Sequence, residues 1–275
     1  MSDDAEALAS LLRSSRRGSL LVVTGAGISL ASGIPTFRGT DPGAVWTRDV
    51  TELGTRRYFE EDPVGSWRWY MARFDKALTA QPNPAHQALV ALERWQADQG
   101  GGQFLLLTQN VDPLHERAGS VRLAKVHGSA DKVRCSREGC RFGAPAGSLL
   151  RDDVDLESFR REPALERVPR CPDASCGALL RQHVLWFDEA YHEHDDYQFH
   201  RVRQFLRELD LVVCVGTSFS VGITEMVLRA ALYLGAPVVA VDPNGVPGVP
   251  ERLLTCLRTP AEVLLPDVVA RLEGA

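Results

Sequence analysis

The segment that follows the apolar run 19–24 could bind a phosphate group. It consists of Gly25, Ala26, Gly27, Ile28 and Ser29. Glycines directly after a strand let the backbone approach a phosphate, and the N-terminus of a following helix favours an anion. The acidic ribose anchor of the common dinucleotide fingerprint is not obvious about 20 residues further on. A turn that only packs a helix on a strand is the alternative interpretation.

A second polar string could hold a sugar and move a proton. Gln109, Asn110, Val111 and Asp112 follow the apolar run 104–108, and α/β folds place ligands at the C-terminal ends of strands. A single Asn or Asp there is more often a helix cap, so the argument depends on the whole string. His127 comes next, and its unperturbed pKa near neutrality suits a general base. A lone histidine is nevertheless usually structural.

Four cysteines have the spacing of a metal site. Four residues separate Cys135 from Cys140 and Cys171 from Cys176, with thirty residues between the pairs. Four thiolates around Zn²⁺ form a closed structural site, and this stretch has few apolar residues to stabilise it otherwise. Unpaired buried thiols are the alternative. Cys214 and Cys256 lie in apolar contexts and fit the core better.

Strands and helices alternate around these residues. The runs 19–24, 104–108, 211–215 and 237–241 are apolar on both faces, as in parallel strands covered by helices. Helical spacing links Ala85, Leu89, Leu92 and Trp95. Thr224 is the expected N-cap of a further helix, which Gly235 would end.

This alternation predicts an α/β fold with a doubly wound, Rossmann-like parallel sheet. Residues 1–130 and 178–275 would form this Rossmann-like domain, with a helical insertion at about 36–84. Residues 131–177, which carry the four cysteines, would form a small inserted zinc-binding module.

Composition narrows the class of protein. The 275 residues are 44% hydrophobic and 24% charged, as in ordinary globular proteins, and the net charge of -5 argues against broad nucleic-acid binding. No apolar run approaches the roughly 20 residues of a membrane helix, and the acidic N-terminus does not resemble a secretory signal. We therefore expect a cytoplasmic protein with neither a nucleic-acid nor a membrane partner. The oligomeric state stays open.

Three strings resemble the motifs of one known family. The run from Gly25 to Gly39, which includes Thr36, Phe37 and Arg38, resembles the NAD loop of the sirtuins. The run from Thr108 to Gly119 is similar to the second sirtuin motif, and His127 stands where the family has its base. The resemblance extends from residue 20 to about 245. It implies an NAD-dependent protein-lysine deacylase with NAD as co-substrate and a structural Zn²⁺.

The resemblance also implies individual roles. Asn110 and Asp112 would hold the ribose and the leaving nicotinamide, while His127 would accept a ribose hydroxyl proton. The adenosine ribose would lie against Gly216, Thr217, Ser218 and Asp242, although the family usually has Asn at the last position. A short strand would pair with the acyl-lysine peptide through Val184, Leu185, Trp186 and Phe187. Asp188 replaces a common glycine.

The acyl group is suggested by Tyr70 and Arg73. On a helix these two side chains share one face, and in some sirtuins such a pair binds the carboxylate of succinyl-lysine. An ordinary amphipathic helix with a solvated arginine is the alternative. The products would be nicotinamide and O-acyl-ADP-ribose, from acetyl-lysine and, with this pair, succinyl-lysine. Two other functions stay open: an NAD-cleaving hydrolase or mono-ADP-ribosyltransferase, and a non-catalytic NAD sensor.

Overall fold

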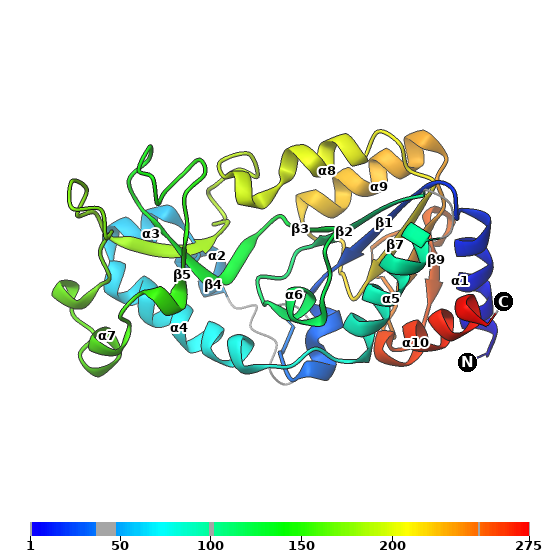
Figure 1. Ribbon diagram of the computed structural model, residues 1–275, viewed down its shortest axis with the longest axis horizontal. Coiled ribbons are helices and arrows are strands. Elements are labelled where there is room, and N and C mark those ends of the chain that lie inside the picture. The colour runs from blue at the N-terminus through cyan, green and yellow to red at the C-terminus, as the bar shows by residue number, and fades with distance from the viewer. Residues whose placement is uncertain (1, 37–47, 99–101, 247, 275) are drawn as a thin grey trace.

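A six-stranded parallel sheet forms the larger part of the molecule (Figure 1). The computed structural model describes residues 2–36, 48–98, 102–246 and 248–274. The strands are β1 (Ser19–Thr24), β2 (Gln103–Thr108), β3 (Leu123–Lys125), β7 (Leu211–Val215), β8 (Val238–Val241) and β9 (Thr255–Leu257). Their order is β3-β2-β1-β7-β8-β9, and every neighbouring pair is parallel. This is the doubly wound, Rossmann-like order, so the predicted fold is confirmed.

Helices cover both faces of this sheet. The helices α1 (Ser2–Ser14), α5 (Pro84–Asp98) and α10 (Ala261–Glu273) pack on one face, whereas α8 (Phe199–Phe205) and α9 (Gly222–Leu234) pack on the other (Figure 1). Successive side chains of a strand point to opposite faces. Leu20 and Val22 therefore belong to one apolar cluster, and Leu21 and Val23 to the other. This two-sided burial explains why the strand sequences are continuously apolar.

The predicted helices form, with one correction at an end. Ala85, Leu89, Leu92 and Trp95 are all buried on α5. Thr224 is not the N-cap of α9: the cap is Val221, and Thr224 lies in the first turn. Its hydroxyl donates to the Val221 carbonyl at 2.7 Å, which a threonine inside a helix can do in place of capping. Gly235 ends the helix with a positive φ of 69°.

A smaller antiparallel sheet lies beside the large one. Its strands β4 (Gly128–Cys135), β5 (Leu149–Leu150) and β6 (Leu180–Val184) have the order β5-β4-β6. The sheet therefore includes residues on both sides of the range 131–177. The helices α2 (Arg48–Leu53), α3 (Arg56–Glu61) and α4 (Pro63–Thr79) lie next to it, together with α7 (Glu157–Arg161).

One apolar cluster joins this sheet to α4. It contains Trp67 and Phe74 from α4 together with Phe159, Leu180 and Cys135. The Trp67 indole N–H also donates to the Leu180 carbonyl at 2.9 Å. The segment with few apolar residues of its own is thus stabilised in part by side chains from the helical insertion.

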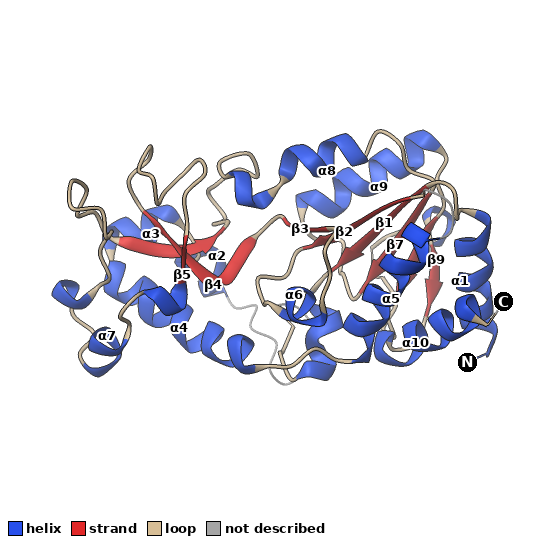
Figure 2. Cartoon of the chain, in the orientation of Figure 1, coloured by secondary structure: helices blue, strands red, loops and turns tan. Residues whose placement is uncertain are grey.

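Short elements complete the chain. They are α6 (Leu114–Ala118) and the 3₁₀ helices Ala26–Ser32, Arg151–Asp153, Leu165–Arg167, Asp195–Tyr197 and Glu251–Leu253. Loops fill much of the region where the two sheets meet (Figure 2). Within the described ranges, every helix is too short or too polar to cross a membrane.

Candidate active site

Four strands of the large sheet end side by side. Thr24 is in register with Thr108 and Val215, and Val215 is in register with Val241. The predicted NAD-binding residues follow these strand ends, at the edge where Rossmann-like folds bind ligands. Sequence segments nearly 200 residues apart therefore meet in one place.

Glycines allow the loop after β1 to contact the loop after β7. The Gly27 N–H donates to the Gly216 carbonyl at 2.9 Å, and Gly216 has a positive φ of 58°. A Cβ on Gly27 would come within 2.6 Å of the Gly216 Cα. These glycines are therefore required by loop packing, whatever ligand is bound. The helix expected after them is a 3₁₀ helix, and Ile28 lies in the core.

A buried hydrogen-bond network joins the two predicted polar strings. The Asn110 amide donates to the Gly25 carbonyl at 3.0 Å and to the Ser29 hydroxyl at 3.3 Å. The Ser29 hydroxyl donates to the Asp112 carboxylate at 3.0 Å. Burial raises the pKa of Asp112, while the Leu114 backbone N–H and Lys125 act in the opposite direction. The side chains predicted to hold the ribose are thus fixed before any ligand binds.

The predicted adenosine-side residues lie at the ends of β7 and β8. The Gln109 amide donates to the hydroxyl of the buried Thr217 at 3.0 Å, which connects this side to the second string. Ser218 is exposed and shares a hydrogen bond with Ser220. Asp242 is half-buried, accepts from the Asn244 N–H at 2.9 Å, and has a pKa raised by burial.

The remaining predicted NAD-binding residues are Ala26, Thr36, Phe37, Arg38 and Val111. Thr36 is half-buried at the end of the described segment, whereas Phe37 and Arg38 lie outside the described residues. Ala26 is half-buried beside the glycines. The Val111 carbonyl accepts from the Ala130 N–H at 2.8 Å, so Val111 connects the second string to the small sheet.

His127 lies between β3 and β4, where the chain passes from the large sheet to the small one. Its Nδ1 donates to the Gln109 carbonyl at 2.8 Å, because a carbonyl can only accept. The neutral ring therefore carries its proton on Nδ1 and offers a lone pair on Nε2. Burial lowers the pKa of His127, with the Gln109 hydrogen bond as a smaller opposing effect. The ring is thus suited to accept a proton at neutral pH.

The predicted peptide-binding segment is only partly a strand. β6 ends at Val184, and Leu185 then donates its N–H to the His127 carbonyl at 2.9 Å. The Phe187 N–H donates to the Gly54 carbonyl at 2.9 Å, so this donor is used within the chain. The Phe187 side chain is 53% exposed, whereas Trp186 is buried in the apolar core. The Trp186 side chain is therefore structural.

Two acidic residues fix this segment in place. The Glu189 carboxylate accepts from the Trp186 N–H at 3.0 Å and pairs with Arg181 and Arg134. Burial would raise the pKa of Glu189, but the charge and hydrogen bonds of Arg181 and the charge of Arg134 lower it to about 2. The Asp188 carboxylate accepts from the first backbone N–H groups of α3, with a distance of 2.8 Å to the Arg56 nitrogen.

Tyr70 and Arg73 share a face of α4 but have different surroundings. Tyr70 is buried, its ring centroid lies 4.6 Å from that of Trp69, and burial raises its pKa. The Arg73 guanidinium lies 3.8 Å from the Trp69 ring centroid and donates to the Trp69 carbonyl at 3.3 Å.

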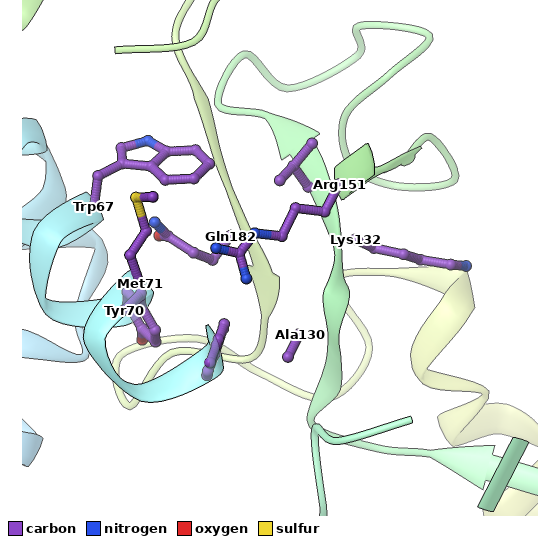
Figure 3. Close-up of a pocket in the computed structure, with 9 residues that line it drawn as sticks. Trp67, Tyr70, Met71, Ala130, Lys132, Arg151 and Gln182 are labelled. Carbon is purple, nitrogen blue, oxygen red and sulfur yellow. The ribbon is translucent and has the colours of Figure 1, made fainter. Parts of the chain in front are cut away.

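A small cavity lies beside Tyr70 but not beside Arg73. Trp67, Tyr70 and Met71 of α4 face Gln182 of β6 across it (Figure 3). Its volume of about 10 Å³ holds no more than one water molecule. This cavity is therefore too small to hold an acyl chain.

The four predicted cysteines come together. Their sulfurs lie within 4.8 Å of one another, and both the Cys135–Cys176 and the Cys140–Cys171 sulfur pairs are 3.6 Å apart without a disulfide. A tetrahedral Zn²⁺ with Zn–S bonds of about 2.3 Å requires sulfurs about 3.8 Å apart, so the cluster fits this ion. Cys214 is buried in the core, as expected.

Sequence reasoning missed three residues around the site. Lys125 donates to the Asp112 carbonyl at 2.8 Å and stands two residues before His127, which was a usable signal. Glu189 follows the peptide segment, but its arginine partners are brought there by the fold. The Tyr191 hydroxyl lies 3.4 Å from the His127 Nε2. The sequence gives no local indication of this contact.

Residues 25–222 match the Sir2 family. The chain is 41% identical over 267 residues to the NAD-dependent protein deacylase 1 of Pseudomonas aeruginosa, covering 96% of this chain and 98% of that one. It is 33% identical over 257 residues to the mitochondrial NAD-dependent protein deacylase sirtuin-5 of Canis lupus familiaris, covering 91% and 81%.

Solved structures show the same similarity. A Sir2 homologue in complex with NAD has a TM-score of 0.75 and 33% identity, covering 96% of this chain and 93% of that one. A Sir2 variant in complex with a deacetylated p53 peptide and 3′-O-acetyl ADP-ribose has a TM-score of 0.78 and 25% identity, covering 97% of each chain.

Proposed function

This chain belongs to the Sir2 family, and on that premise we propose that it is an NAD-dependent protein-lysine deacylase. It removes acyl groups from lysine side chains and releases nicotinamide and O-acyl-ADP-ribose. The observation that carries this function is the position of His127. Its Nε2 lone pair lies where the polar strings of the large sheet meet the peptide segment 184–187. The hydrolase, ADP-ribosyltransferase and sensor readings are not favoured.

The residues of the site have separate tasks in this reaction. When bound, NAD supplies an electrophilic ribose carbon and a nicotinamide leaving group. Asn110, Ser29 and Asp112 form a fixed, buried polar wall for the ribose, so little reorganisation is needed during the reaction. His127 accepts a proton from a ribose hydroxyl at Nε2, which its lowered pKa leaves unprotonated at neutral pH.

A structural Zn²⁺ is part of this proposal. Cys135, Cys140, Cys171 and Cys176 would hold the ion and tie β4 to the loop before β6. Four thiolates complete the coordination of Zn²⁺, so no position remains for a substrate. The ion therefore stabilises the small sheet and takes no part in the chemistry.

The acyl group is proposed to include acidic chains such as succinyl. Tyr70 and Arg73 lie one turn apart on α4, and stacking on Trp69 orients the Arg73 guanidinium. An oriented guanidinium can form two parallel hydrogen bonds with a carboxylate. Similarity to a sirtuin-5 that is named a deacylase, rather than a deacetylase, supports the same reading. Acetyl-lysine, which is shorter, would also be accepted.

The proposed substrates are acyl-lysine residues of proteins or peptides in the cytoplasm. All six cysteines lie within the described residues and form no disulfide, which suits a reducing compartment.

A panel of acetyl-, succinyl- and longer acyl-lysine peptides tests the function. We expect deacylation of at least the acetyl and succinyl peptides, and only when NAD is present. Deacylation without NAD, or cleavage of NAD with every peptide left acylated, would contradict the proposal.

A further inference from the structure

Tyr191 stacks on His127 from a distant part of the chain. It lies in the loop between β6 and α8, and its ring centroid is 5.8 Å from that of His127, with an angle of 17° between the planes. Phe199 of α8 also stacks on Tyr191, with centroids 5.2 Å apart. The His127 ring is therefore the end of a three-ring stack that rests on α8.

The hydroxyl of Tyr191 donates a hydrogen bond to His127. Because the His127 Nδ1 donates to Gln109, its Nε2 must accept, and the Tyr191 O–H at 3.4 Å is the donor. The backbone N–H of Ile223, in the first turn of α9, lies near this oxygen. Burial raises the pKa of Tyr191, which keeps the proton on the hydroxyl.

We propose that Tyr191 is a positioning residue for His127: it holds the ring by stacking and stabilises its neutral form by donating a hydrogen bond to Nε2. This inference rests on the proposed function only in taking His127 as the base. In the ligand-free protein the Tyr191 hydroxyl is hydrogen-bonded to the Nε2 lone pair, which keeps His127 neutral. When NAD binds, the ribose hydroxyl replaces Tyr191 at this lone pair. A hydrogen bond to the neutral form lowers the pKa of a histidine.

Other ionisable groups near His127 are engaged elsewhere. Among the described residues, no carboxylate, lysine or arginine contributes to the lowered pKa of His127. On the neighbouring segments, Asp112 is held by Ser29, Lys125 pairs with Glu116, Glu189 pairs with Arg181, Glu193 pairs with Arg56, and Glu225 pairs with Arg229. His192 is exposed in the same loop as Tyr191. Tyr191 is therefore the side chain whose change should act on the His127 proton equilibrium.

Tyr191→Phe tests the inference because it keeps the ring and removes only the hydroxyl. We expect the pKa of His127 in the ligand-free protein to rise by about half a pH unit, the size expected for one weak neutral hydrogen bond. NMR titration of the seven histidines measures it, with the His127 signal assigned by its loss in His127→Ala. The acid limb of the kcat/KM profile should move to higher pH by the same amount, because the base must be neutral.

Tyr197→Phe is the matched control. Tyr197 is buried, and its ring contacts are with His183 and His194 rather than His127. This variant should leave the His127 titration unchanged. An unchanged His127 pKa in Tyr191→Phe would overturn the inference and leave the proposed function intact. Absence of deacylation by the wild-type protein would instead contradict the proposed function, and the NMR titration would still decide the role of Tyr191.

Discussion

At the scale of single residues, Ser29 connects two polar strings that are about 80 positions apart in the chain. Its hydroxyl accepts from Asn110 and donates to Asp112. The sequence identified all three residues, because each belongs to a long local string. It did not predict their mutual bonds, which depend on the pairing of β1 with β2. Residue types could be predicted here, but their partners could not.

Glu189 leads to a prediction about stability and pH. Its carboxylate has no exposed side-chain surface and pairs with Arg181 and Arg134. Its pKa of about 2 is below the unfolded value near 4.5, so its stabilisation is present above about pH 4.5 and is lost as the pH falls toward 2. Glu189→Gln should reduce the free energy of unfolding at pH 7 by about 3 kcal/mol.

Denaturant unfolding at several pH values measures this effect. The difference between wild type and Glu189→Gln should shrink below about pH 4.5, because the carboxylate then takes up a proton in the unfolded chain while it stays ionised in the folded protein down to about pH 2. Glu138→Gln is the control. Glu138 likewise pairs with an arginine, Arg56, but its side chain is 77% exposed and should contribute less than about 1 kcal/mol. A difference that stays constant down to pH 2 would rule out this account of Glu189.

At the scale of elements, Asp188 explains how the chain accommodates a departure from the family pattern. Its carboxylate accepts from the Arg56 and Arg57 N–H groups at the start of α3. An acidic group at a helix N-terminus satisfies free donors and interacts favourably with the helix dipole. Asp188 therefore ties the peptide segment to the helical insertion. The sequence showed the substitution but not the helix end that it meets.

Replacing Asp188 by the glycine of other family members should loosen this connection. We expect Asp188→Gly to lower the free energy of unfolding by about 1 kcal/mol, as for a lost helix cap, and to raise the KM for the peptide. Asp188→Asn keeps an acceptor oxygen and should retain most of the stability. Thermal unfolding and peptide kinetics of both variants test this. Equal stability of Asp188→Gly and wild type would show that the cap has no energetic role.

The small sheet should depend on its metal ion. We predict one Zn²⁺ per chain by metal analysis, and loss of that ion in Cys176→Ser. Cys256→Ser, which changes a cysteine outside the cluster, should keep the full zinc content. Removal of the ion by a chelator should disorder the small sheet, since metal binding contributes directly to folding in such modules. A fully folded protein without zinc, or a disulfide within the cluster, would contradict this prediction.

At the scale of the whole molecule, the elements that could be predicted are those with a long, regular sequence pattern. The four central strands were identified because each is apolar on both faces. The two edge strands, β3 and β9, have three residues each and too little pattern to identify. The cluster of four cysteines was predictable from spacing alone. The three-ring stack on His127 was not, because it forms only when α8 packs on the large sheet.

The proposed acyl preference depends on Arg73, which the helical insertion adds to a site built mainly on the large sheet. Arg73→Met should lower kcat/KM for succinyl-lysine by roughly 30-fold or more, because losing one partner of a desolvated charge pair costs about 2–5 kcal/mol. Acetyl-lysine has no carboxylate and should change little. Arg68→Met, an exposed arginine on the same helix, is the control and should affect neither substrate. If the ratio of kcat/KM for succinyl-lysine to kcat/KM for acetyl-lysine is the same in Arg73→Met and wild type, Arg73 does not recognise acidic acyl groups. The protein would then be a general deacylase.

The central claim is that NAD cleavage and lysine deacylation are one reaction that uses His127. The most direct test is a mass-spectrometric count of products from an acyl-lysine peptide and NAD. We predict equal amounts of deacylated peptide, nicotinamide and O-acyl-ADP-ribose. His127→Ala should be about 10²–10⁴ times slower, whereas His200→Ala, an exposed histidine on α8, should match wild type. Free ADP-ribose with an intact acyl-peptide, or normal turnover by His127→Ala, would contradict the account.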